Sequence, residues 1–158
     1  MITLYLIRHG IAAERGTYAN DGERPLTAKG RQRTRRVAER LAQTIQVELI
    51  LTSPLVRAQQ TAEILGEAGL GEVAVSEHLA PDGDFHQWLG WLAGWRGEAL
   101  AMVGHEPNLS EWAERLLWGQ CRGCLAVKKA GVLGLHLPNN SPEGNSALFW
   151  LAPPRLLL

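Results

Sequence analysis

The sequence lacks an excess of either charge. Its 158 residues include 16 Lys plus Arg and 16 Asp plus Glu, so the formal net charge is zero. A balanced chain produces no long-range field that would draw it to nucleic acid or to an anionic membrane. We therefore expect neither as a partner. Any recognition of anions must come from a local group of side chains.

The chain also lacks a long apolar run. The first apolar segment, residues 2–7, stops at Arg8, far short of the roughly 20 residues that cross a bilayer. No basic stretch followed by an apolar signal core stands at the N-terminus. These features predict a soluble, cytoplasmic protein with no membrane partner.

Cysteine is scarce as well. Cys121 and Cys124 are the only two, in the stretch CRGC. A second C-x-x-C is absent, so a structural zinc would need histidines from elsewhere, and free thiols near a turn are the favoured interpretation. A redox-sensitive pair is the alternative. A chain of this length buries roughly two thirds of its unfolded surface without a disulfide or metal, and we predict one domain, residues 1–158.

Short apolar runs alternate with amphipathic segments along the chain. This pattern predicts strands over residues 1–7, 47–52, 72–77 and 99–105, and helices over 26–45, 53–69, 84–95 and 107–119. Thr27 is the expected N-cap of the first helix. Ser53 is expected to cap the second, with Pro54 in its first turn and Gly66 or Gly69 at its end. Residues 130–138 and 146–153 flank a turn-rich stretch and predict a terminal hairpin.

Alternating strands and helices favour an α/β fold. We predict a three-layer α/β/α sandwich with a mostly parallel central sheet, since helical crossovers cover both faces of such a sheet. Ligands bind beyond the carboxyl ends of the strands in this architecture. We therefore expect a functional site at those ends.

Three predicted strands end in cationic or polar residues. The first delivers Arg8, His9 and Gly10; the second leads into the helix that carries Arg57; the third delivers His105. Each residue alone has an ordinary structural explanation, such as a surface position or a satisfied histidine. Two Arg and two His at one sheet edge, however, form a group rich in hydrogen-bond donors and suited to a tetrahedral dianion.

The same residues carry a family resemblance. The stretches LIRHG, SPLVRAQQTAE and VGHEPNLS resemble, in order, the three signature blocks of the histidine phosphatase superfamily, also called phosphoglycerate-mutase-like. ERPLTAKGRQ and EHLAPDGD resemble the short branch that includes SixA-type phosphohistidine phosphatases. Arg-His-Gly alone is a weak signal, whereas the five stretches together are specific.

The resemblance implies a role for each matched residue. His9 would be the nucleophile that becomes phosphorylated, with Arg8, Arg57 and His105 holding the phosphoryl oxygens. Arg24 would line the pocket, and Gly10 follows the nucleophile at the substrate side. Nearby cations should disfavour the imidazolium form of His9 and lower its pKa.

An acid that protonates the leaving group is weakly marked. Glu77 is the nearest match after the third strand, with Asp82 and Asp84 as rivals. For the two aspartates, a cap of the following helix is the favoured interpretation. The resemblance also shows a departure: many relatives have an acidic residue where this chain has Ile11, which affects the expected orientation of the substrate, and Glu14 and Glu23 are the candidates to replace it.

The resemblance implies a phosphatase that works in two steps through a phosphohistidine on the enzyme, without metal or cofactor. Its substrate would be a phosphorylated protein, foremost one that carries phosphohistidine. The alternatives are a small-molecule phosphomonoesterase with the same pocket and a non-catalytic phosphoprotein-binding module. A basic stripe on the first helix could dock an acidic partner, although a solvated face is favoured; it comprises Lys29, Arg33, Arg36 and Arg40.

Overall fold

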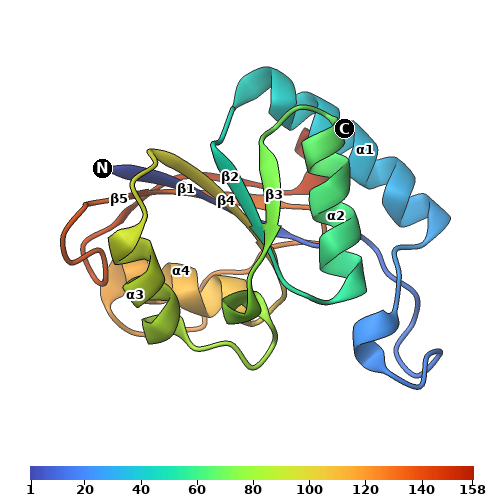
Figure 1. Ribbon diagram of the computed structural model, residues 1–158, viewed down its shortest axis with the longest axis horizontal. Helices are drawn as coiled ribbons and strands as arrows, with labels where there is room; N and C mark the ends of the chain where they lie inside the picture. Colours follow the sequence, from blue (N-terminus) through green and yellow to red (C-terminus); the bar gives the residue numbers. More distant parts are fainter.

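The computed structural model describes all 158 residues (Figure 1). Its helices are α1 (Ala28–Thr44), α2 (Val56–Glu67), α3 (Phe85–Gly94) and α4 (Asn108–Trp118). Its strands are β1 (Ile2–Arg8), β2 (Leu49–Thr52), β3 (Glu72–Val75), β4 (Ala99–Gly104), β5 (Val132–Leu137) and β6 (Ala147–Ala152). Short 3-10 turns cover Asp21–Glu23, Glu77–Leu79 and Pro154–Leu156.

The six strands form one sheet in the order β3-β2-β4-β1-β5-β6. The first four strands in this order are parallel to one another, while β5 runs antiparallel to both β1 and β6. The predicted mostly parallel sheet and the terminal hairpin are both confirmed. Because the parallel strands point the same way, their carboxyl ends meet at one edge.

Helices cover both faces of this sheet, which makes the three predicted layers (Figure 1). On one face, Val37 and Leu41 of α1 and Leu65 of α2 belong to the same core cluster as Ile7 and Val103 of the strands. On the other face, α3 and α4 contribute to a second cluster, with residues that include Trp88, Trp112, Leu6 and Met102. Alternate strand residues thus enter opposite cores, as a pleated strand requires.

The start of α1 confirms one predicted cap. The Thr27 hydroxyl accepts from the Gly30 N–H at 2.9 Å, which satisfies one of the free donors of the first turn. Gly30 is needed there because a Cβ would lie 2.0 Å from the Ile11 carbonyl oxygen. The chain segment after β1 therefore packs directly against the beginning of α1.

The predicted cap of α2 is wrong. This helix begins at Val56, after an extended Leu55 that makes no capping bond through its side chain, so Pro54 lies outside the first turn. Instead, the Ser53 hydroxyl accepts from the Leu55 N–H at 3.2 Å and lies 2.7 Å from Nε2 of His105. Ser53 therefore stands two residues before the N-cap position, where its hydroxyl joins the start of α2 to His105.

None of the helices is long and apolar enough to cross a membrane.

Candidate active site

Strand register brings the two histidines together. Arg8, the last residue of β1, pairs with Gly104, the last residue of β4, so His9 and His105 are the next residues on neighbouring parallel strands. Their ring centroids lie 5.2 Å apart. The structure thus places these two predicted residues at one edge of the sheet.

Arg57 reaches the same place from the first turn of α2, which follows directly on β2. Together with Arg8, His9, Arg24 and His105 it lines a cavity of about 330 Å³. His9, Arg24, Arg57 and His105 are each no more than 7 % exposed. Four residues predicted for the phosphoryl group therefore share one cavity, and Arg24 lines it as well.

His9 is poised as a neutral imidazole. Its Nδ1 lies 2.7 Å from the Gly10 carbonyl oxygen, which can only accept, so Nδ1 carries the hydrogen and Nε2 keeps a lone pair. Burial, with His105, Arg57 and Arg8 adding to it, lowers the pKa of His9 to about 3, although the Gly10 carbonyl acts in the opposite direction. At neutral pH, Nε2 is a nucleophile.

His105 is neutral for similar reasons. Burial and the positive charges of Arg57 and Arg8 lower its pKa to about 4. The buried Ser53 hydroxyl accepts from the Leu55 N–H, and Nε2 of His105 is the one acceptor within reach of its hydrogen, so Ser53 donates to Nε2. This tautomer leaves an N–H on Nδ1, which is the side of the ring without a partner.

Gly10 acts through its backbone. Its carbonyl fixes the His9 tautomer, and its N–H donates to the Thr61 hydroxyl at 3.1 Å. A Cβ at this position would meet the Thr34 hydroxyl at 2.4 Å. Gly10 does not line the cavity, so its predicted place at the substrate side is not seen here.

Asp21 bridges two of the arginines and was not singled out in the sequence. One carboxylate oxygen accepts from Nε of Arg24 at 2.7 Å and the other from Arg57 at 3.2 Å. The Asp21 backbone carbonyl also accepts from Arg57 at 2.9 Å. The hydrogen bond from Arg24 is the main reason that the pKa of Asp21 lies below its ordinary value. A contact between Asp21 and Arg24 could have been expected from their spacing of three residues. Nothing in the sequence predicts the contact with Arg57, which lies 36 residues away.

Glu106 supports the site from the start of the loop that leads into α4. Its carboxylate accepts from the Ser110 N–H at 2.9 Å and from the Val127 N–H at 3.2 Å, and the Ser110 hydroxyl also donates to it. The Val127 carbonyl in turn accepts from Arg8 at 3.1 Å. This chain of contacts orients the Arg8 guanidinium.

Three nitrogen donors of the site are buried and have no partner: Nε of Arg8, Nε of Arg57 and Nδ1 of His105. Buried polar groups in proteins are nearly always hydrogen-bonded, so a buried donor without a partner is unusual and often marks a functional position. All three belong to residues that line the cavity, where an oxyanion would find cationic groups and N–H donors.

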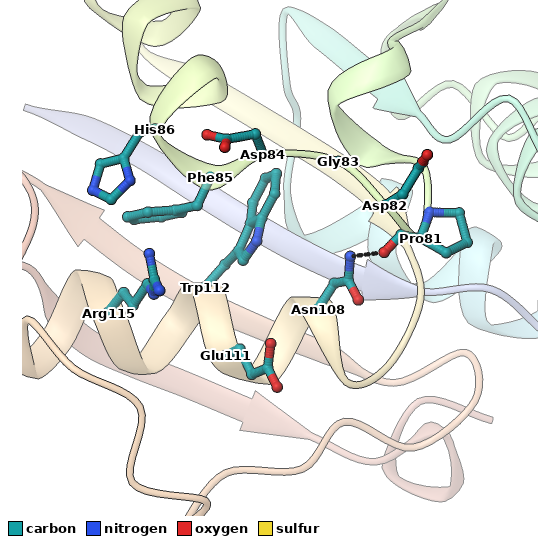
Figure 2. Close-up of a pocket in the computed structure, with 10 residues that line it drawn as sticks. All are labelled: Pro81, Asp82, Gly83, Asp84, Phe85, His86, Asn108, Glu111, Trp112 and Arg115. Carbon is teal, nitrogen blue, oxygen red and sulfur yellow. Dashed lines mark hydrogen bonds between the residues drawn. The ribbon is translucent and has the colours of Figure 1, made fainter.

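The acids suggested for leaving-group protonation lie elsewhere. Glu77 is exposed and does not line the cavity of His9. Asp84 accepts from the Gln87 N–H at 3.0 Å, which confirms its helix cap. Asp82 and Asp84 line a second cavity beside the N-terminal turns of α3 and α4 (Figure 2), which shares no lining residue with the first. The carboxylates that do line the first cavity are Glu14 and Glu106.

The remaining sequence features take ordinary positions. Cys121 and Cys124 are free and exposed. The basic stripe on α1 is exposed at Lys29, Arg36 and Arg40 and half-buried at Arg33. No group of three or more His, Cys, Asp or Glu side chains is arranged to hold a metal ion.

The fold, the paired histidines and the donor-rich cavity define a phosphoryl-transfer class of site. A family model described as the histidine phosphatase superfamily, branch 1, matches residues 4–111. The chain belongs to this superfamily.

Two similar sequences and one similar structure indicate the branch of the superfamily. An uncharacterized protein of Picosynechococcus sp. is 48% identical, with 98% of both chains covered. The phosphohistidine phosphatase SixA of Escherichia coli K12 is 36% identical over 96% of this chain and 93% of its own. A solved structure of the protein histidine phosphatase SixA, complexed with tungstate, has a TM-score of 0.86 at 26% identity and covers 99% of this chain and 100% of the other. The resemblance to the SixA type is thereby confirmed.

Proposed function

We propose that this protein removes a phosphoryl group from phosphohistidine in another protein and that the group passes through His9. The observation that carries the proposal is the neutral His9 imidazole beside three buried donors that lack partners. The similarity to SixA, named a phosphohistidine phosphatase, supports the substrate class. The solved SixA structure that this fold matches is a complex with tungstate, a tetrahedral oxyanion like phosphate. We further propose that residues 1–158 work as one domain.

In the first step, the Nε2 lone pair of His9 attacks phosphorus in line with the leaving group. The new P–N bond forms as the bond from phosphorus to the substrate nitrogen breaks, and the departing imidazole nitrogen takes a proton from water. Arg8, Arg57 and the Nδ1–H of His105 hold the non-bridging oxygens, so the charge that develops on them is stabilised by fixed donors.

In the second step, water attacks the phosphorus bound to His9. The P–N bond breaks, its electron pair returns to Nε2, and inorganic phosphate leaves. The Gly10 carbonyl keeps the hydrogen on Nδ1 through both steps, so the same nitrogen is used in every cycle. We propose that the fixed cations supply the electrostatic stabilisation and that no metal is needed.

The carboxylates at the cavity favour a phosphoramidate substrate. Glu106 is held by Ser110 and Val127 and Glu77 lies outside the cavity. Glu14 lines the cavity, but it is exposed and has no contact that would position it as an acid. An imidazole leaving group takes up a proton readily at neutral pH. An alkyl alcohol depends more on a positioned acid.

Phosphate release tests the proposal. The wild-type protein and the His9→Ala variant are incubated with phosphoramidate and with a phosphohistidine protein, in the presence of a chelator. We expect the wild type to release phosphate and to carry a transient acid-labile label, and His9→Ala to do neither. His86→Ala, at an exposed histidine outside the site, serves as the matched control and should behave like the wild type.

Three outcomes would overturn parts of the proposal. A clear preference for sugar phosphates over phosphoramidates would identify a small-molecule phosphomonoesterase. Tight phosphate binding with no labelled enzyme would identify a non-catalytic binding module. Activity that the chelator removes would show that a metal is required.

A further inference from the structure

The mouth of the His9 cavity carries two cations that the phosphoryl site does not use. Arg15 and Lys129 both line the cavity and are both exposed. Neither side chain has a hydrogen-bond or ion-pair partner in the chain. Arg8, Arg24 and Arg57, in contrast, are each held by an oxygen acceptor of the protein.

The two cations come from loops that flank the end of β1. Arg15 follows β1, whereas Lys129 precedes β5, the antiparallel neighbour of β1. The backbone next to Lys129 is fixed to β1, because the Ala130 N–H donates to the Arg8 carbonyl at 3.0 Å. Burial is the main reason that the pKa values of Arg8 and Arg57 lie below the ordinary value, and the charge of nearby Arg15 lowers both further.

Carboxylates do not neutralise the cations of this cavity. Five Arg and Lys side chains line it, against two carboxylates, Glu14 and Glu106. Asp21, which does not line the cavity, adds one negative charge beside Arg24 and Arg57. The mouth therefore keeps a local positive charge on a chain whose net charge is zero.

The cavity is also larger than a phosphoryl group requires. Its volume of about 330 Å³ corresponds to the liquid volume of on the order of ten water molecules. A phosphoryl group seated against His9, His105 and Arg57 at the buried end leaves room for part of its carrier. The carrier would then pass between Arg15 and Lys129.

We propose that Arg15 and Lys129 form a carboxylate subsite that recognises an acidic group next to the phosphoryl group of the substrate. This inference rests on the proposed function and adds to it the chemistry of the carrier. The carboxylate can come from an acidic side chain beside a phosphohistidine or from a small phosphorylated acid. Both sources present the same group to the same two cations.

The test uses two matched pairs of substrates. The first pair consists of phosphohistidine peptides that differ only in Asp or Glu against Asn or Gln beside the phosphohistidine. The second pair consists of phosphomonoesters with and without a neighbouring carboxylate. Phosphoramidate, which has no carrier, is measured alongside to report on the phosphoryl site itself.

The wild type should prefer the acidic member of a pair by about five- to tenfold in kcat/KM at low salt, as two exposed ion pairs would give. The Arg15→Gln/Lys129→Gln double variant should lose this preference, with the ratio falling towards one. Lys128→Gln changes an adjacent exposed lysine that does not line the cavity and should keep it. High salt should weaken the preference because exposed charges are screened.

The pair of substrates that shows the preference identifies the source of the carboxylate. A wild type without preference in either pair, or a double variant that retains it, would overturn the inference. Either result can occur while phosphoramidate is still hydrolysed, so it leaves the proposed function standing. A wild type inactive on phosphoramidate and on every carrier would instead refute the proposed function.

Discussion

At the scale of single residues, Asp21 has the least expected role. It is an exposed side chain on a loop, yet it contacts two arginines of the cavity. Two guanidinium groups repel each other when close, and a shared carboxylate offsets that repulsion. Asp21 thus acts as a positioning residue for Arg24 and Arg57.

Replacing Asp21 with Asn should lower kcat/KM for phosphoramidate by roughly two- to fivefold, the range expected for a solvent-exposed ion pair. The loss is modest because the Asp21 backbone carbonyl still holds Arg57. Steady-state kinetics should place more of the change in KM than in kcat, since the arginines bind the substrate before they stabilise its transition state. Glu23→Gln, on the same turn but without contacts to the arginines, is the control. An increase in kcat/KM would show instead that Asp21 competes with the substrate.

The residues that we propose to be catalytic could be picked out from the sequence because they stand in short motifs. His9, Arg57 and His105 each stand at a strand end or helix start that the pattern of apolar residues marks. Ser53 and Asp21 could not be assigned in this way. Their roles depend on partners 52 and 36 residues away, and a local cap or a surface loop explains each of them equally well in the sequence.

At the scale of elements, the segment between α4 and β5 connects several parts of the site. It contains Val127, which accepts from Arg8, and Lys129, which lines the cavity. The segment is fixed to α4 by Glu114, which is 1 % exposed. Burial alone would raise the pKa of Glu114, but hydrogen bonds from the backbone of Arg122, Leu125 and Cys124 outweigh it and lower the pKa below its usual value.

Glu114→Gln should destabilise the protein by about 1–3 kcal/mol, because the amide group turns one acceptor into a donor that faces a backbone N–H. Chemical denaturation measures the free energy of unfolding, and hydrogen exchange at residues 121–125 should become faster. Glu111→Gln, an exposed position on the same helix, controls for the change of charge. Equal stability of the two variants would mean that Glu114 does not anchor the segment.

The order of the strands in the sheet is the property of the elements that the sequence did not specify. Four parallel strands could be recognised, but their order, β3-β2-β4-β1, places the first strand beside the fourth. The pairing of β1 with β4 is what puts His9 next to His105. The strand order results from packing helices against both faces, which is a property of the assembled sheet.

At the scale of the whole molecule, the buried histidines tie stability to pH. His9 has a pKa of about 3 and His105 of about 4 in the folded protein, against roughly 6.5 for an ordinary histidine. Below about pH 6.5, these two histidines become protonated in the unfolded chain. In the folded protein, His105 stays neutral until the pH approaches 4 and His9 until it approaches 3. The free energy of unfolding therefore rises with pH in this window and falls as the pH drops.

Denaturation curves between pH 7 and 4 test this linkage. The wild type should lose stability on acidification more steeply than His9→Ala, which has removed one of the two groups that must charge on unfolding. The buffers contain no phosphate, because phosphate bound to the folded protein would add to its stability. His86→Ala, at an exposed position, should follow the wild type. Parallel curves for the wild type and His9→Ala would contradict the assigned neutral state of His9.

The sequence by itself determined the fold class, the superfamily and the four residues that meet in one cavity, Arg8, His9, Arg57 and His105. These are encoded locally, in the period of the apolar residues and in motifs at the strand ends. The tertiary structure alone decided which histidine nitrogen is free, which carboxylate bridges the arginines and which cations stand at the mouth of the cavity. Hydrogen-bond partners and local charge depend on residues that are distant along the chain, and only folding brings them within reach of one another.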